Sequence, residues 1–330
     1  MRFALSDEQV HAAAELRGLL AREYPPKALR ARWEGAADDG ALWSRLCEMG
    51  LTSLLVPEGD GGLGGDELDL VSLLEECGRA AVPGPVVESC WVAPALAPAS
   101  LRALVASGAA RVACGDGEAP LVADADTAEW LLLARGGDAF LLERARVTLS
   151  ARQPSVDGAR SLHEVRWRPE DGVRVGAASE LRARAAAGLA AVLLGLSRRM
   201  LDMTAEYVQI RRQFGVPVGS FQAVKHPLAN ALVRLSIARP VVLRAAYSFA
   251  RRDPARELHA SMAKAFAAES ALLSARVALQ AHGAIGYSFE HDLHLFMKRA
   301  WALAAAFGGP LEHRERVASH LFDHRDTEST

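Results

Sequence analysis

The second half of the chain is dominated by long segments in which apolar residues recur at helical spacing. They cover residues 181–208, 227–251, 255–282 and 290–306, and a shorter piece follows Pro310. Breaks at 215–219 and at 253–254 separate them. Apolar residues three and four positions apart give each helix an apolar stripe, which must be buried against another helix. We therefore predict a four-helix bundle over residues 175–330.

The first half of the chain changes its hydrophobic period. Helical spacing covers residues 10–20, 40–49, 66–81 and 86–96, which predicts a helical domain over residues 1–97. Between 98 and 174, short apolar runs alternate with turn residues, which predicts a small antiparallel β domain. The runs are 121–122, 130–133, 139–142, 147–149 and 163–168. The expected fold is mainly α, with the helical domain, the β domain and the bundle in that order.

Charge and composition exclude several classes of protein. The formal net charge is -2, which argues against the strongly basic surface of a general nucleic-acid binder. The longest apolar stretch, 185–196, is shorter than the roughly 18–20 residues of a membrane span, and no apolar leader segment follows Met1. The cysteines Cys47, Cys77, Cys90 and Cys114 form no CxxC pair and indicate free thiols in a reducing compartment. We expect a cytoplasmic protein that binds neither nucleic acid nor membrane.

Two local patterns resemble binding sites, but each favours a simpler interpretation. The apolar run before the Gly-rich loop 59–65 and the helix after it mimic a dinucleotide-binding fingerprint. However, the loop and its flanks contain three acids that would repel a diphosphate, namely Glu58, Asp60 and Asp66. No alternating strands and helices follow to build a parallel sheet, so we predict a packing loop. His291 and His294 have no third ligand at a clear spacing, and we predict no metal site.

The most informative segment is 207–229, which reads YVQIRRQFGVPVGSFQAVKHPLA. Two adjacent arginines at a helix end could form a fork for a phosphate, an aromatic could stack on a flat ring, and two amides could donate hydrogen bonds. An ordinary joint between two helices would also explain the segment. The residue types alone leave both interpretations open.

The spacing in this segment resembles that of the acyl-CoA dehydrogenase family. The family pattern around its flavin is an aromatic, three residues, R-x-Q-F-G-x-P and then F-Q-x-x-x-H. The matching residues are Tyr207, Arg211, Gln213, Phe214, Gly215, Pro217, Phe221, Gln222 and His226. Residues 280–287 resemble the family's Q-x-x-G-G-x-G-aromatic turn, and residues 43–85 resemble its N-terminal part. The resemblance therefore covers essentially the whole chain, and it implies the same α–β–α order.

The resemblance implies a cofactor, a substrate and site residues. Members bind FAD and oxidise an acyl-CoA thioester to the trans-2-enoyl-CoA, with a carboxylate removing the α-proton. Arg211 would contact the diphosphate of the FAD bound to a neighbouring subunit. Phe214 would pack on the flavin or adenine, and Gln213 and Gln222 would support it. Gln280 and Gly283 would line the adenosine side.

The chain departs from the family where the catalytic base is expected. The commonest family position falls at residues 307–310, and the alternative position falls near Ala185; neither holds a carboxylate. The second Gly of the turn is Ala284, and the short β domain lacks the family's Thr-Glu-Pro and Gly-Ser-Asp segments. The catalytic residue is therefore left unassigned.

Three functions are compatible with these departures. The chain could be one subunit of a heteromeric acyl-CoA dehydrogenase whose partner supplies the base, as in short members that handle bulky acyl-CoAs such as steroid side-chain thioesters. It could be a self-sufficient homo-oligomeric enzyme with a relocated base, for which Glu180, Glu290 and Asp292 are the candidates. It could also be a structural subunit without flavin. We favour the first.

Overall fold

A helical layer forms the N-terminal part of the protein, whose computed structural model describes residues 4–35, 39–117 and 120–323. Its elements are α1 (Asp7–Glu23), α2 (Pro26–Trp33), α3 (Gly40–Glu48), η1 (Glu58–Asp60), α4 (Glu67–Arg79), η2 (Glu88–Val92), α5 (Ala93–Leu96) and α6 (Ala99–Ala106). All the predicted helices are present. Helix α6 was not predicted, because we assigned residues 98–174 to the β domain. Nor was α2, because we interpreted Pro25 and Pro26 only as a break. They occupy the N-cap and first helical positions of α2, where a missing N–H costs no hydrogen bond.

The middle of the chain forms two small sheets. Their strands are β1 (Val112–Asp116), β2 (Leu121–Ala123), β3 (Trp130–Arg135), β4 (Asp138–Glu143), β5 (Thr148–Leu149), β6 (Leu162–Arg166) and β7 (Val173–Ala177). The four-stranded sheet has the order β1-β3-β4-β7, and the three-stranded sheet has the order β2-β6-β5. The prediction of a purely antiparallel domain was wrong, because β1 pairs with β3 in parallel. The intervening β2 belongs to the other sheet, so the chain returns to the first sheet in its original direction.

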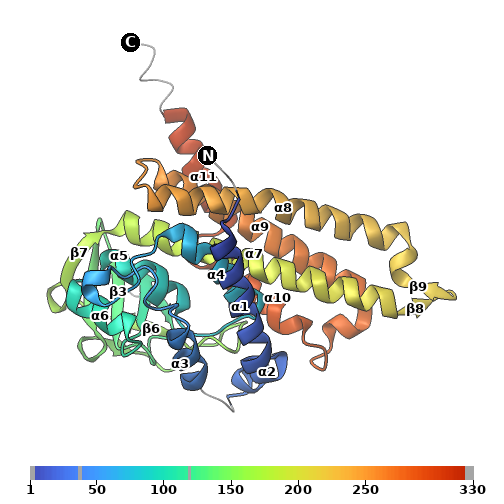
Figure 1. Ribbon diagram of the computed structural model, residues 1–330, viewed down its shortest axis with the longest axis horizontal. Helices are drawn as coiled ribbons and strands as arrows, with labels where there is room; N and C mark the ends of the chain where they lie inside the picture. Colours follow the sequence, from blue (N-terminus) through green and yellow to red (C-terminus); the bar gives the residue numbers. More distant parts are fainter. Residues whose placement is uncertain (1–3, 36–38, 118–119, 324–330) are drawn as a thin grey trace, which may run out of the picture.

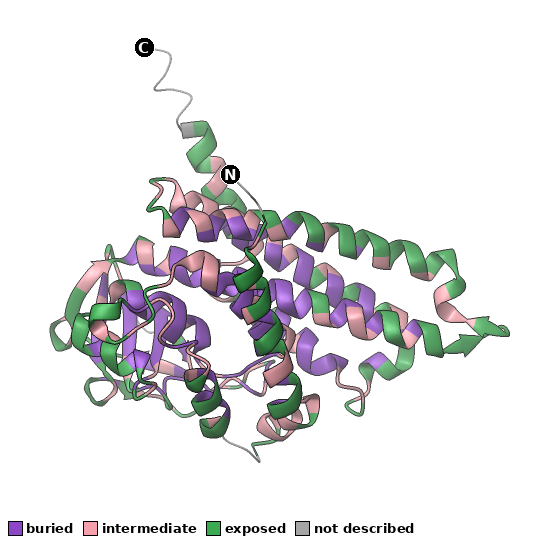
Figure 2. Ribbon diagram, in the orientation of Figure 1, coloured by how far each residue is buried: buried purple, intermediate pink, exposed green. Residues whose placement is uncertain are grey.

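The predicted C-terminal bundle is confirmed. It consists of α7 (Ala178–Ile210), α8 (Gln222–Ala250), α9 (Arg256–His282) and α10 (Leu293–Ala305), followed by α11 (Pro310–Asp323). Figure 2 shows that most of α7 is buried, since it crosses the molecule between α4 and the rest of the bundle. Two glycines allow this crossing: a Cβ on Gly78 would lie 2.0 Å from the Val192 carbonyl oxygen, and one on Gly195 would lie 1.8 Å from that of Glu75. The N-terminal helices and the bundle therefore share one core.

The two ends of the bundle differ. In Figure 1 the sheets lie at one end, and a small hairpin of β8 (Arg212–Gln213) and β9 (Val216–Pro217) projects at the other. Within the described residues, no helix combines the length and the apolar character that a bilayer span requires. The four cysteines are free thiols.

Candidate functional site

The hairpin end of the bundle carries the informative segment. Helix α7 ends at Ile210, and Arg211 turns the backbone into β8 while its N–H still donates to the Tyr207 carbonyl at 2.9 Å. Phe214 and Gly215 form the two-residue turn and both have positive φ, 53° and 80°. Two positive φ values are what a tight type I′ hairpin turn requires. The turn exposes 91% of Phe214 to solvent.

A cavity of about 1070 Å³ lies beside this hairpin, between α7, α8 and α9. It contains four of the six predicted cofactor residues, namely Arg211, Gln213, Gln280 and Gly283. The other lining residues are Tyr207, Val218, Ala223, Val224, Pro227, Asn230, Leu273, Arg276, Val277, Ala281, His282, Ala284 and Ile285. Phe214 and Gln222 lie nearby on the hairpin tip and at the start of α8, but they do not line it. Residues far apart in the sequence thus form one site.

The charge of this cavity suits an anion. Arg211 and Arg276 both line it, no carboxylate does, and neither arginine has an ion pair among the described residues. Gly283 has φ +62°, and no heavy atom lies within 4 Å of the position a Cβ would take. A ligand can therefore approach the backbone there. Unpaired guanidinium groups and open backbone fit the diphosphate of a dinucleotide.

Stacked rings form one wall of the cavity. Tyr207 stacks on His282 at 4.4 Å between centroids and 17° between planes, and His291 lies 4.6 Å from His282. Burial lowers the pKa of both histidines, so the rings are neutral near pH 7. His282 Nδ1 contacts the Ala278 carbonyl at 2.8 Å, which makes Nε2, buried and without a partner, the acceptor nitrogen. A flat neutral wall of this kind suits an aromatic base.

Sequence reasoning missed two of these residues. Arg276 lies one helical turn before Gln280 on α9 and therefore on the same face, so the four-residue spacing could have revealed it. His282 precedes Gly283 in the turn and could have been noticed as a ring beside the expected adenosine site. Among the described residues, no group of three or more His, Cys, Asp or Glu side chains is arranged to hold a metal ion.

Comparisons with known proteins agree over most of the chain. The family model described as "Acyl-CoA dehydrogenase, N-terminal domain" matches residues 6–101, and that described as "Acyl-CoA dehydrogenase, C-terminal domain" matches residues 174–322. Acyl-CoA dehydrogenase IpdE2 of Mycobacterium tuberculosis is 33% identical over 317 residues, which cover 92% of this chain and 94% of the relative. The chain belongs to the acyl-CoA dehydrogenase family.

Solved structures show the same fold. The ChsE4-ChsE5 complex of Mycobacterium tuberculosis contains a chain that matches with a TM-score of 0.85 at 24% identity, covering 97% of this chain and 99% of that one. A steroid acyl-CoA dehydrogenase variant named Tcur3481-Tcur3483 matches with a TM-score of 0.86 at 24% identity, covering 98% and 100%. At this identity the likeness establishes the acyl-CoA dehydrogenase fold, and each of these two structures is named for a pair of proteins.

The loop where acyl-CoA dehydrogenases most often carry their base is held by hydrogen bonds and has no carboxylate here. Phe307 and Gly308 both have positive φ, 54° and 104°. The buried Lys264 donates to the carbonyls of Ala304 at 2.9 Å and Gly308 at 3.0 Å, and His313 Nε2 lies 3.1 Å from the Phe307 carbonyl. Burial lowers the pKa of Lys264 to about 7. No side chain in this loop can accept a proton from a substrate.

The cavity beside that loop is small. It measures about 40 Å³ and is lined by Phe307, by Leu189 one turn after the alternative base position, and by the carboxyl-bearing Glu88 and Asp124. Removal from water raises the pKa of Glu88 to about 7 and that of Asp124 to about 6. Such a volume holds a few water molecules, whereas ligand sites span roughly 300–1,000 Å³. An acyl thioester does not fit.

Two of the three candidate bases are ion-paired. Glu180 is bound by Arg184 at 2.7 Å and by Arg256 at 2.9 Å. Asp292 is bound by Arg30 at 2.5 Å. Glu290 is exposed. None of the three lines the cavity next to residues 307–310.

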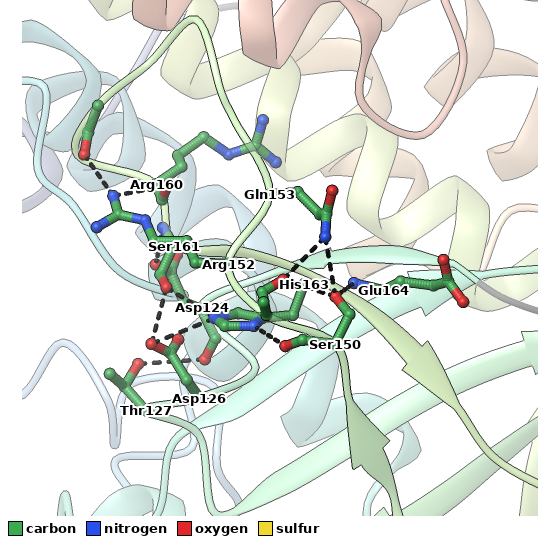
Figure 3. Close-up of polar contacts among 12 residues, drawn as sticks. Asp124, Asp126, Thr127, Ser150, Arg152, Gln153, Arg160, Ser161, His163 and Glu164 are labelled. Carbon is green, nitrogen blue, oxygen red and sulfur yellow. Dashed lines mark hydrogen bonds and ion pairs between the residues drawn. The ribbon is translucent and has the colours of Figure 1, made fainter.

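A polar network in the β domain holds the loop before β6 (Figure 3). Ser161 Oγ donates to Asp126 at 2.7 Å and lies 3.0 Å from His163 Nε2, while His163 Nδ1 lies 2.9 Å from the Ser150 carbonyl. A hydrolytic triad needs its carboxylate on Nδ1, so this Ser, His and Asp set is not arranged for nucleophilic catalysis. It fixes the loop that carries Asp157.

Proposed function

We propose that this chain is one subunit of a heteromeric, FAD-dependent acyl-CoA dehydrogenase that desaturates an acyl-CoA at its α,β-bond. The observation that carries the proposal is the contrast between its two sites. The basic cavity for a dinucleotide is open and about 1070 Å³, whereas the cavity beside the usual base position is about 40 Å³ and its loop has no carboxylate. A partner subunit would supply the base and the space for the acyl group.

The chain's own residues would bind and orient the cofactor. FAD, when bound, supplies the acceptor for the β-hydride. Arg211 would neutralise its diphosphate, Gln280 and the open backbone at Gly283 would receive the adenosine part, and Gln213 would donate an amide hydrogen bond. Phe214, 91% exposed on the hairpin tip, is placed to reach beyond this chain and pack on a cofactor shared with the partner. Gln222, exposed at the start of α8, would support the same contact.

An exposed apolar face supports oligomer formation. Several large apolar side chains on α8, on the hairpin and at the end of α7 are between 39% and 79% exposed. They are Leu232, Val233, Ile237, Val216 and Ile210. Figure 2 shows α8 and the hairpin as largely exposed along their outer side. Exposed large apolar residues concentrated at one end of a molecule favour a protein interface. We propose an acyl-CoA dehydrogenase-like subunit as the occupant, and a bulky acyl-CoA, such as a steroid side-chain thioester, as the substrate class.

Purification of the chain from its own cells tests this proposal. We expect a tagged chain to co-purify with a second acyl-CoA dehydrogenase that has a carboxylate at the usual base position, and the complex to be yellow. The measurements are native mass spectrometry and the visible absorbance of the flavin. A colourless homo-oligomer would support the structural-subunit function instead, and a yellow homo-oligomer with full activity would support the self-sufficient enzyme.

The two adjacent arginines of the hairpin should differ in their effect on FAD. Arg211 lines the cavity, whereas Arg212 is exposed and donates only to the Gly215 carbonyl at 3.4 Å. We expect Arg211→Ala to weaken FAD binding by about 10- to 150-fold, since an ionic hydrogen bond contributes about 1.5–3 kcal/mol. The matched control Arg212→Ala should cost about fivefold or less, as for an exposed charge. Flavin fluorescence titration measures both; equal losses would contradict the assignment of Arg211.

A further inference from the structure

Arg276 is the feature of the nucleotide cavity that the family pattern does not explain. It lies near the C-terminal end of α9, outside both motifs, yet it lines the same cavity as Arg211, which comes from the end of α7. The two guanidinium groups are thus brought by two different helices to one cavity without a carboxylate. Both side chains are exposed, so an anion that enters the cavity can reach both charges.

The lack of an ion pair at Arg276 contrasts with its surroundings. On the same bundle, Arg234, Arg239, Arg256 and Arg299 each pair with a carboxylate. The nearest acid on the same face of α9 is Glu269, two helical turns earlier. Its carboxylate already binds Arg234 at 2.6 Å and also Arg314. Arg276 also lines the neighbouring cavity that contains Glu269. It forms no ion pair with any described residue and remains available to a ligand.

We propose that Arg276 is a second diphosphate-binding residue, which with Arg211 clamps the ADP part of FAD and makes the cavity select a nucleotide with two phosphates. The inference rests on the proposed FAD site and adds a residue and a selectivity to it. Two guanidinium groups match the two negative charges of a dinucleotide diphosphate, and each can bind a phosphate oxygen pair in a fork. The stacked wall of Tyr207 and His282 lies beside them for the adenine.

Coenzyme A also contains an adenosine diphosphate and is the other possible source of this chemistry. Its additional 3′-phosphate brings about two further negative charges, since a phosphomonoester carries about -1.5 to -2 at pH 7. Two arginines do not balance them, and the other lining residues provide no further cation. We therefore assign the cavity to FAD, and competition between the two molecules separates them.

Calorimetric titration of the full-length chain with ADP, AMP and adenosine at low salt tests the inference without any catalytic assay. We expect wild type to bind ADP more tightly than AMP, and AMP more tightly than adenosine. Arg276→Gln should weaken ADP binding by about 10- to 100-fold, the range of one ionic hydrogen bond, and leave adenosine binding within about twofold. Arg276→Lys should retain part of the ADP affinity, because it keeps the charge and loses the fork. FAD should displace bound ADP, and coenzyme A at the same concentration should not.

The matched control is Arg212→Gln, an exposed arginine next to the cavity that does not line it. It should leave the ADP affinity within about twofold, as expected for a charge screened by solvent. Thermal melts of all variants establish that each is folded. Three results would overturn the inference: wild type that binds no ADP, an ADP affinity unchanged by Arg276→Gln, or displacement by coenzyme A in preference to FAD. These outcomes are separate from those that test the proposed function. If the chain binds ADP through Arg276 but forms no active dehydrogenase with any partner, only the proposed function is refuted.

Discussion

Purified alone and loaded with FAD, this chain should reduce its flavin with an acyl-CoA about 10²–10⁴-fold more slowly than its complex with a base-supplying partner. That factor is the usual contribution of a positioned general base. The loop at residues 307–310 and the α7 position Ala185 have no carboxylate, and the adjoining cavity is about 40 Å³. Stopped-flow bleaching of the flavin absorbance measures the rate for the single chain and for the complex.

The carboxylates of this chain provide the controls for that experiment. Glu180→Gln, Glu290→Gln and Asp292→Asn should leave the residual rate of the single chain unchanged, because two of the acids are ion-paired and none lines the small cavity. Glu88→Gln is measured together with these variants. Unlike the other three acids, Glu88 lines that cavity, and removal from water raises its pKa to about 7. A rate loss of about 100-fold or more in any one of these variants would identify a base within this chain and favour the self-sufficient enzyme.

Replacing Arg299 should have the largest effect on stability. Arg299 on α10 donates to Asp157 at 3.0 Å and to the Val82 carbonyl at 2.5 Å, and the two side chains of the ion pair are 6% and 0% exposed. Trp33 Nε1 also donates to Asp157, at 3.1 Å. Arg299→Met leaves a buried carboxylate without its cation, so we expect it to lower the free energy of unfolding by about 3–5 kcal/mol.

A surface ion pair supplies the matched control. Arg198 binds Asp202 at 2.9 Å with 52% of its side chain exposed, and Arg198→Met should cost about 1 kcal/mol or less. The double variant of Arg299→Met with Asp157→Asn should recover part of the loss, because it removes the unpaired charge. Denaturant unfolding followed by circular dichroism measures all three variants. A loss at Arg299→Met no larger than at Arg198→Met would show that the buried pair does not hold the domains together.

Local patterns were sufficient for most of the helices and strands. The helical spacing predicted the long helices. Ser6 caps α1, accepting from the Gln9 N–H at 3.2 Å. The change of period located the strands β2 to β6. Strand β7 was missed because its residues are mostly exposed and show no apolar alternation. The parallel pairing of β1 with β3 depends on where β2 goes, which no local pattern encodes.

The sequence by itself determined the family, the order of the parts and the residues of the hairpin motif, because each is written in spacings of a few residues. Only the tertiary structure brought Arg276 from α9 to Arg211 from α7, and only it placed Arg299 against Asp157, 142 residues earlier in the chain. It also reduced the cavity beside residues 307–310 to about 40 Å³. Cavity size, burial and unpaired charge depend on which distant side chains meet, and the free energy of those contacts is set by packing across the whole core rather than by neighbouring residues.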